Sequence, residues 1–137
     1  MTFAELDNLV RIGKLKREPP SDRELAGLLA SAMARLHDAD NPALSFDSRF
    51  DLAYNAAHAL SLYALRRAGL RAEHRYLAFQ ALPHTAAAPP EIWRVLAKAH
   101  ERRNLSEYEG QLDVDERLLS GVLAATHQLH RLLLTDS

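Results

Sequence analysis

The segment from Arg102 to Gly110 contains the residues of this chain whose types and spacing point most clearly to chemistry. Within it, Arg103 and Asn104 stand where an apolar helical stripe that begins at Ile92 reaches its next inward position, and Tyr108 lies one turn after Asn104. A guanidinium on the inner side of a helix needs a partner, because burying an unpaired charge is costly. Core packing alone does not explain a cation at this position. We therefore take Arg103, Asn104 and Tyr108 as candidate catalytic residues.

The position of Tyr108 relative to Arg103 depends on whether the helix continues through this segment. On a continuous helix the two residues lie about 140° apart around the axis, so they meet only if the helix breaks or a second subunit contributes. His100, Asn104 and Tyr108 then share one face instead. The simpler interpretation is that Arg103 pairs with Glu107 one turn away and that Asn104 caps a helix end, since both are common helix devices.

The elements that must position these residues are predicted to be helices. Val, Ile and Thr together number ten, so the β-branched residues that strands favour are scarce, while Ala and Leu dominate. Amphipathic stretches with short connections favour an all-α fold, an antiparallel up-and-down bundle of about five to six helices. We expect a single domain, with an N-terminal helix and linker over residues 1–20 and the bundle over residues 21–137. The predicted helices cover residues 3–12, a stretch from 21 that ends before 41, 47–68, 72–82, a stretch that starts at Pro90, and 113–133.

The helix predicted over residues 47–68 has an apolar and a polar side. Asp51, Asn55 and His58 form the polar stripe. Gly69 is placed to adopt the left-handed conformation that commonly ends a helix. The inward positions are Phe50, Ala53, Tyr54, Ala57, Leu60 and Ala64.

Local signals define other helix ends. Ser21 and Glu24 have the spacing of a capping box, in which each side chain accepts a hydrogen bond from the other residue's backbone N–H. Pro83 is expected to stop the fourth helix, because proline cannot continue the ladder of backbone hydrogen bonds. Asp113 and Glu116 are expected to provide an acidic cap for the last helix.

Composition excludes several classes of function. The chain has no cysteine, so it can hold neither a disulfide framework nor a thiolate metal site nor a cysteine nucleophile. Its first residues lack the basic start and apolar run of a signal peptide, and no window approaches the roughly 18 apolar residues of a membrane span. We expect a cytoplasmic protein without a membrane partner.

The distribution of charge is uneven, although the formal net charge is only -1. Attraction of nucleic acid by the whole molecule is therefore not expected, and such binding requires local asymmetry. Between Arg94 and Arg103, four cations stand against Glu101 and give a local charge of +3. Helix faces exposed to water are the simpler interpretation of such runs.

Metal and cofactor motifs are not found in the sequence. The closest histidine pair, His127 and His130, would need a third ligand that the sequence does not dictate. There is no glycine-rich phosphate loop, and the chain has only five glycines. We predict neither a metal nor a cofactor.

Several of these segments together resemble the HEPN superfamily of helical bundles. The motif of that family is an Arg, often Arg-Asn, followed about four to six residues later by His. Arg103-Asn104 matches its opening, and Tyr108-Glu109-Gly110 resembles the ending seen in one branch. Residues 48–58 resemble the second long helix of that branch, and Gly69-Leu70-Arg71 with His74 resembles the segment that comes after that helix.

This resemblance covers about half of the chain and implies a homodimer. In active members the motif forms a metal-independent ribonuclease site across a dimer cleft, and such proteins occur in toxin–antitoxin and antiviral systems. Some are controlled by a nucleotidyltransferase that modifies a tyrosine beside the motif, which would make Tyr108 a modification site. Here Tyr108 takes the position of the motif histidine, so catalysis is either lost or depends on His100 or His58 as the base.

The sequence leaves three hypotheses. The first is a HEPN-like homodimer that binds RNA, or cleaves it as a metal-independent ribonuclease of toxin–antitoxin type, with a cognate antitoxin or nucleotidyltransferase as partner. The alternative is a non-catalytic helical module for dimerisation or protein interaction. The third is a small-ligand pocket among facing helices, bordered by Asn55, His58 and Arg103. The residues assigned to binding are Arg49, Asn55, His58, Arg71, His74, His100 and Arg102.

Overall fold

The computed structural model describes residues 3–110 and 114–135, and for Phe3, Glu107 and Tyr108 it describes the backbone only. Within these residues the chain forms seven helices and two short strands. Their order is α1 (Phe3–Arg11), β1 (Leu15–Arg17), α2 (Asp22–Ala39), α3 (Phe46–Arg67), β2 (Leu70–Ala72), α4 (Arg75–Gln80), α5 (Leu82–Thr85), α6 (Pro90–Glu109) and α7 (Glu116–Thr135).

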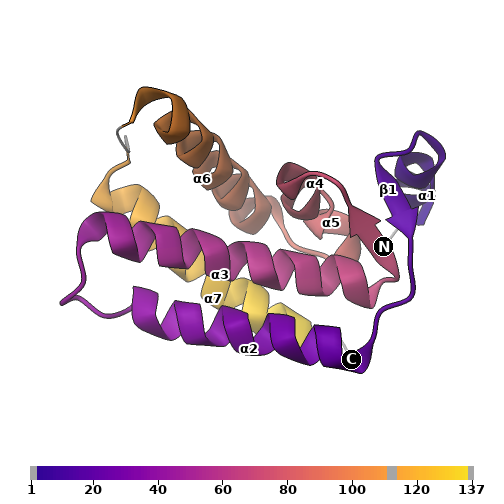
Figure 1. Cartoon of the computed structure of the whole chain (residues 1–137), viewed down its shortest axis with the longest axis horizontal. Helices are drawn as coiled ribbons and strands as arrows, with labels where there is room; N and C mark the ends of the chain where they lie inside the picture. The colour runs from indigo at the N-terminus through magenta and orange to yellow at the C-terminus, as the bar shows by residue number, and fades with distance from the viewer. Residues whose placement is uncertain (1–2, 111–113, 136–137) are drawn as a thin grey trace.

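The central helix of the bundle is α3. It runs antiparallel to α2, α7 crosses behind it, and α6 packs in turn on α7 (Figure 1). The six positions predicted to face inward, from Phe50 to Ala64, are all buried. The helix starts at Ser45, whose hydroxyl accepts a hydrogen bond from a backbone N–H of the first turn, and ends before Gly69, whose φ of +79° is left-handed as predicted. The mostly helical bundle is therefore confirmed.

Two helix boundaries differ from the prediction. The helix predicted over residues 72–82 is divided among β2, α4 and α5, and Pro83 lies in the first turn of α5 instead of ending a helix. Proline fits there because the N–H that it lacks would have no acceptor within the helix. At the start of α7, the side chain that accepts a backbone hydrogen bond belongs to Asp115. Glu116 is the first residue of the helix, and Asp113 lies outside the described residues.

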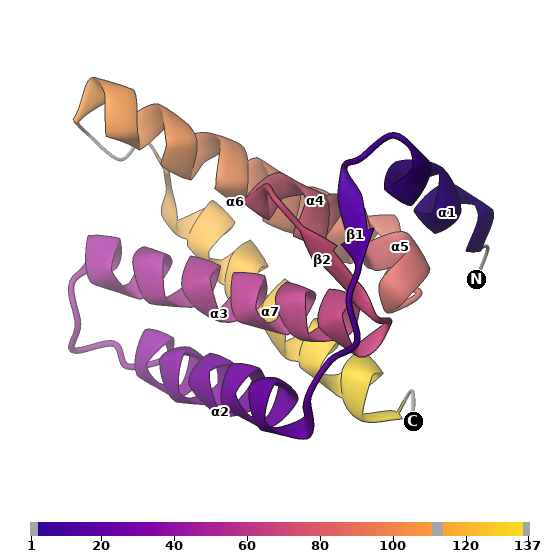
Figure 2. The same cartoon turned by 45° about the vertical axis from the view of Figure 1, so that its right-hand side comes forward.

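The strands β1 and β2 form a two-stranded antiparallel sheet that the sequence did not predict (Figure 2). Leu15 pairs with Ala72, and Arg17 pairs with Leu70. Leu15 and Leu70 are buried together in a small apolar cluster, which is distinct from the main core between the long helices. Burial of these two leucines thus imposes strand geometry on segments without a single β-branched residue.

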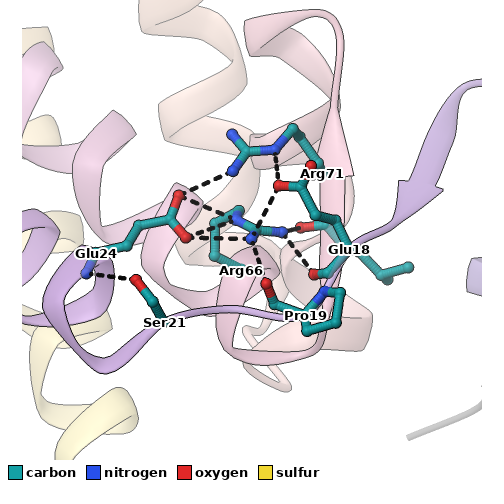
Figure 3. Close-up of polar contacts among 7 residues, drawn as sticks. Glu18, Pro19, Ser21, Glu24, Arg66 and Arg71 are labelled. Carbon is teal, nitrogen blue, oxygen red and sulfur yellow. Dashed lines mark hydrogen bonds and ion pairs between the residues drawn. The ribbon is translucent and has the colours of Figure 1, made fainter.

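A buried arginine, Arg66, joins the end of α3 to the segment that leads into α2 (Figure 3). Its side chain is 2% exposed. The guanidinium donates to the backbone carbonyls of Glu18, Pro19 and Leu70 over 2.9 to 3.2 Å, and to the carboxylate of Glu24 over 3.1 to 3.2 Å. Arg66 therefore satisfies backbone groups that would otherwise lack partners where the chain leaves regular structure.

The capping box predicted at the start of α2 is half formed. The Ser21 hydroxyl accepts a hydrogen bond from the Glu24 N–H over 3.1 Å, as predicted. The Glu24 carboxylate, however, binds Arg66 and Arg71, and the hydrogen bond from Arg66 is the main cause that lowers the pKa of this carboxyl. Arg71 also pairs with Glu18. This arginine, assigned to binding from the sequence, is thus a member of a structural ion cluster.

Removal of Arg66 should destabilise the protein far more than removal of its neighbour Arg71. We expect Arg66→Met to lower the free energy of unfolding by about 3 to 5 kcal/mol, because it leaves Glu24 and several carbonyls without their buried partner. Arg71→Met should cost less than about 1 kcal/mol, since Arg71 is half-exposed and water screens its ion pairs. Urea unfolding of both variants measures the difference, and equal losses would contradict the assigned roles.

Candidate functional site at the seam of α3 and α6

No helix of the described residues is both long and apolar enough to cross a membrane.

A cluster of polar and aromatic side chains lies where α3, α4 and α6 meet, on the side of the bundle away from α2. We call this group the seam cluster. Its members are Asp51, Tyr54 and His58 of α3, Phe79 of α4, and His100, Arg103 and Asn104 of α6.

Tyr54 lies at the centre of the seam cluster. The residue is 1% exposed, so its hydroxyl needs a partner within the protein. That partner is Nδ1 of His100, 2.9 Å from the tyrosine oxygen. The Tyr54 ring also contacts the rings of His58, Phe79 and His100, with centroid distances of 5.8 to 6.5 Å. The ring therefore connects all three helices of the seam.

Arg103 presents its guanidinium to the same ring. Its Cζ lies 4.8 Å from the centroid of Tyr54, a cation–π distance, and its Nε donates to Oδ1 of Asp51 over 3.1 Å. Arg103 continues the apolar stripe of α6, in which Ile92 and Ala99 are buried in the core. The Arg103 side chain keeps 27% of its surface exposed, and the Asp51 side chain keeps 57%. The cation is thus held by α3 and still faces solvent.

The imidazole of His100 is hydrogen-bonded at both ring nitrogens. Nε2 lies 3.0 Å from the amide nitrogen of Asn104, one turn further along α6. An amide nitrogen only donates, so Nε2 is the acceptor, and Nδ1 of the neutral ring carries the proton that is donated to Tyr54. This arrangement orients a histidine through a second residue and directs its basic nitrogen along the outer side of α6.

His58 differs from His100 in having a buried nitrogen without a partner. Its Nε2 makes no hydrogen bond within the described part of the chain. Burial lowers the pKa of His58 to about 4, and repulsion by the charges of Arg75 and Arg103 and by the charged form of His100 acts in the same direction. His58 is therefore neutral near pH 7 and is a weak base, so it packs as a ring between Tyr54 and Phe79.

The interpretation of Arg103 and Asn104 as ordinary helix devices is wrong for Asn104 and stays a prediction for Arg103. Arg103 binds the carboxylate of Asp51 on another helix. Its predicted pairing with Glu107 is not tested, because the side chain of Glu107 lies outside the described part. Asn104 does not cap a helix end, because α6 continues for a further turn to Gly110, whose φ is +70°. Continuity of α6 places position 108 on the face of positions 100 and 104. The Tyr108 side chain lies outside the described part, so its predicted role stays a prediction.

Several residues assigned to binding do not join the seam cluster. Arg49 donates to the carbonyl of Ala39 over 2.9 Å and so connects α3 to the end of α2. His74 precedes α4 and makes no side-chain cap. Asn55 borders the cluster, because its amide donates to the backbone carbonyl of Asp51 over 2.8 Å and to the Asp51 carboxylate over 3.4 Å. Arg71 belongs to the Arg66 ion cluster instead.

Sequence patterns did not indicate the residues that hold Arg103 in place. Asp51 was placed on a polar stripe and Tyr54 among core residues, but neither was assigned to the site. Nothing in the local pattern relates position 51 to position 103, which lies in a different helix. The contact exists only because α3 and α6 meet around Phe79 of α4.

A hollow of about 650 Å³ opens beside the seam cluster, on the outer face of α6. We call it the α6 hollow. Tyr76 of α4 forms one side of it, and His100 and Asn104 belong to both the hollow and the seam cluster. Its lining residues are Tyr76, Trp93, Arg94, Ala97, Lys98, His100, Glu101, Arg102 and Asn104.

The two histidines weighed as metal ligands lie on α7, away from these groups. Nε2 of His127 lies 3.0 Å from Oδ2 of Asp40, and burial lowers the pKa of His130. Among the residues that the structure describes, no three His, Cys, Asp or Glu side chains converge as a metal site would require.

Comparison of the chain with protein-family models, with curated proteins and with solved structures finds no match.

His58 should make the protein less stable as the pH falls. Its folded pKa is near 4 and the unfolded value near 6.5, so in this window the unfolded chain binds the proton and the folded chain does not. Relative to His58→Phe, the native chain should lose on the order of 2 kcal/mol of unfolding free energy between about pH 7 and about pH 5. Urea unfolding at both pH values measures this, and parallel losses in the two proteins would contradict it.

Proposed function

We propose that this protein is a HEPN-like RNA-binding protein and that the seam cluster is its binding site. The observation that carries the proposal is the convergence of Arg103, Asn104, His100 and His58. These residues come from two helices, and hydrogen bonds or ring contacts join them through Tyr54. The HEPN resemblance assigns its phosphate-binding arginine to Arg103. Physical contacts thus support Arg103 and Asn104, two of the residues to which the sequence motif points.

The contacts of Arg103 suit exchange with a phosphate. Its carboxylate partner, Asp51, is more than half exposed, so little free energy is needed to separate the pair. The Tyr54 ring stays behind the guanidinium and keeps it in place while its hydrogen-bond partner changes. Arginine can bind a phosphate through two parallel hydrogen bonds. Three further cations, Arg94, Lys98 and Arg102, line the adjoining hollow and raise the local attraction for a polyanion.

A metal-independent ribonuclease of toxin–antitoxin type is the second candidate function. The hydrogen-bonded series from Tyr54 through His100 to Asn104 favours it, because it supplies an oriented base beside Arg103. In this reaction a 2'-hydroxyl takes the place of the Asn104 amide and gives its proton to Nε2 of His100. The 2'-oxygen bonds to phosphorus, the 5'-oxygen leaves and takes a proton from water, and Arg103 stabilises the phosphorane charge.

The HEPN resemblance also carries the proposed partners, which are a second copy of the chain and a cognate antitoxin or nucleotidyltransferase. The rival proposal is a helical dimerisation or protein-interaction module without chemistry. Solution mass and RNA binding separate the two proposals, because only the first requires affinity for RNA that falls steeply with salt.

Removal of Arg103 should weaken RNA binding and flatten its salt dependence. We expect Arg103→Ala to reduce affinity for a fluorescent single-stranded RNA by about tenfold, since a hydrogen bond to a charged group contributes roughly 1.5 kcal/mol or more. The slope of log affinity against log salt should fall by about 0.7, the value for one phosphate contact. Arg103→Lys keeps the charge and should lose less. Fluorescence anisotropy across a salt series gives both quantities.

The matched control is Arg23→Ala, which removes the same charge from α2, a helix that packs on α3 and α7 rather than on α6. If Arg23→Ala and Arg103→Ala lower RNA affinity equally, the binding is explained by general electrostatic attraction, and the seam cluster is not the RNA-binding site. RNA cleavage measured with the same proteins, and with His100→Gln, tests the second candidate. If the native chain, Arg103→Ala and His100→Gln cleave alike, the ribonuclease proposal is removed and binding stands alone.

A further inference from the structure

We propose that the α6 hollow holds one unpaired nucleobase together with an adjacent phosphate, which makes the protein selective for single-stranded RNA. This inference rests on the proposed function and specifies how the RNA is recognised. The hollow opens on the outer face of α6, opposite the side that Leu96 and Ala99 bury in the core. Its volume of about 650 Å³ lies within the range of ligand pockets that hold molecules of nucleotide size.

Two aromatic side chains from different helices line this hollow. Trp93 of α6 is half-buried, and Tyr76 of α4 keeps 40% of its surface exposed. The Tyr76 ring lies 5.5 Å from the ring of His100, centroid to centroid, so it is packed against the seam cluster. Aromatic surface left open to water at a hollow suits a flat apolar ligand, and base stacking on such rings contributes about 1 to 3 kcal/mol per base.

The cations of the hollow form a row along α6. Arg94, Lys98 and Arg102 lie four residues apart, so their positions succeed one another about 6 Å along the helix axis. Glu101 is the acidic residue among the lining residues, and Asp115 lies beside Lys98 and Arg102 in a neighbouring hollow. The guanidinium of Arg94 also lies 5.6 Å from the centroid of the Trp93 ring. Positive charge therefore stands beside the aromatic surface, the combination that single-stranded nucleic acid requires.

Polar groups among the lining residues can bind the edge of a base. Asn104 offers an amide, His100 an imidazole, and Glu101 a carboxylate. His100 and Asn104 already bond each other, so a base at this place lies directly beside the seam cluster. A base inside a duplex is stacked on both faces and paired along its Watson–Crick edge, so it cannot contact these rings. The geometry thus favours an unpaired base over a duplex.

The test uses Trp93, which is the chain's single tryptophan, so its fluorescence reports on the hollow alone. We expect 5'-AMP to quench this fluorescence in a saturable manner, whereas ribose 5-phosphate, which lacks the base, should not. Tyr76→Leu should weaken 5'-AMP binding about tenfold, while Tyr76→Phe, which keeps the ring, should bind as the native chain does. Lys98→Gln should weaken binding several-fold through the lost phosphate contact, and the matched control Lys14→Gln should not.

Three outcomes would overturn the inference. An equal response to ribose 5-phosphate would show that the hollow binds only the phosphate and not a base. No response to 5'-AMP would show that the hollow does not bind a nucleotide. Circular dichroism first confirms that both Tyr76 variants are folded. Equal affinity of the Tyr76→Leu and Tyr76→Phe proteins for 5'-AMP would then contradict stacking, because loss of the ring would make no difference. If 5'-AMP does not bind but RNA binding still depends on Arg103, the α6 hollow is rejected as a base site and the seam cluster remains the RNA-binding site. If 5'-AMP quenches the fluorescence but RNA binding does not depend on Arg103, the seam cluster is rejected and the α6 hollow remains.

Discussion

The buried ring of Tyr54 is the feature on which the candidate site depends. Its hydroxyl fixes the imidazole of His100, its face holds the guanidinium of Arg103, and the ring also packs against His58 and Phe79. A phenol can do this because it is largely apolar and yet carries one polar group that must be satisfied when buried. The contacts that α3 and α6 make through this residue therefore set the geometry of the polar groups at the seam.

The two arginines at the ends of α3 show how the same side chain can serve stability or function. Arg66 is almost fully buried, and its hydrogen bonds go to carbonyls and to the carboxylate of Glu24, so it stabilises the fold where α3 joins β2. Arg103 comes from α6 to the other end of α3, faces solvent in part, and shares an ion pair with the exposed Asp51. Exchange of a ligand is thus far less costly at Arg103 than at Arg66.

Sequence reasoning predicted the parts of the fold that depend on local pattern. The inward side of α3, the Ser21 cap and the left-handed Gly69 are all set by spacing and residue type. It failed where contacts between distant segments decide the structure. The β1–β2 pair forms without β-branched residues, Arg71 turns toward Glu24, and Asp51 meets Arg103 across two helices. The candidate arginine was visible in the sequence, whereas the residues that hold it depend on how α3 and α6 pack.

The most direct test of the seam as a site is a double-mutant cycle between Tyr54→Leu and Arg103→Met, measured as free energy of unfolding in urea. The guanidinium lies 4.8 Å from the ring centroid at a partly buried position, so we expect a coupling energy of about 1 kcal/mol. That result would show that Tyr54 holds the cation at the seam. Effects that add within about 0.3 kcal/mol would show that the two side chains act independently, and the seam would then not be a site.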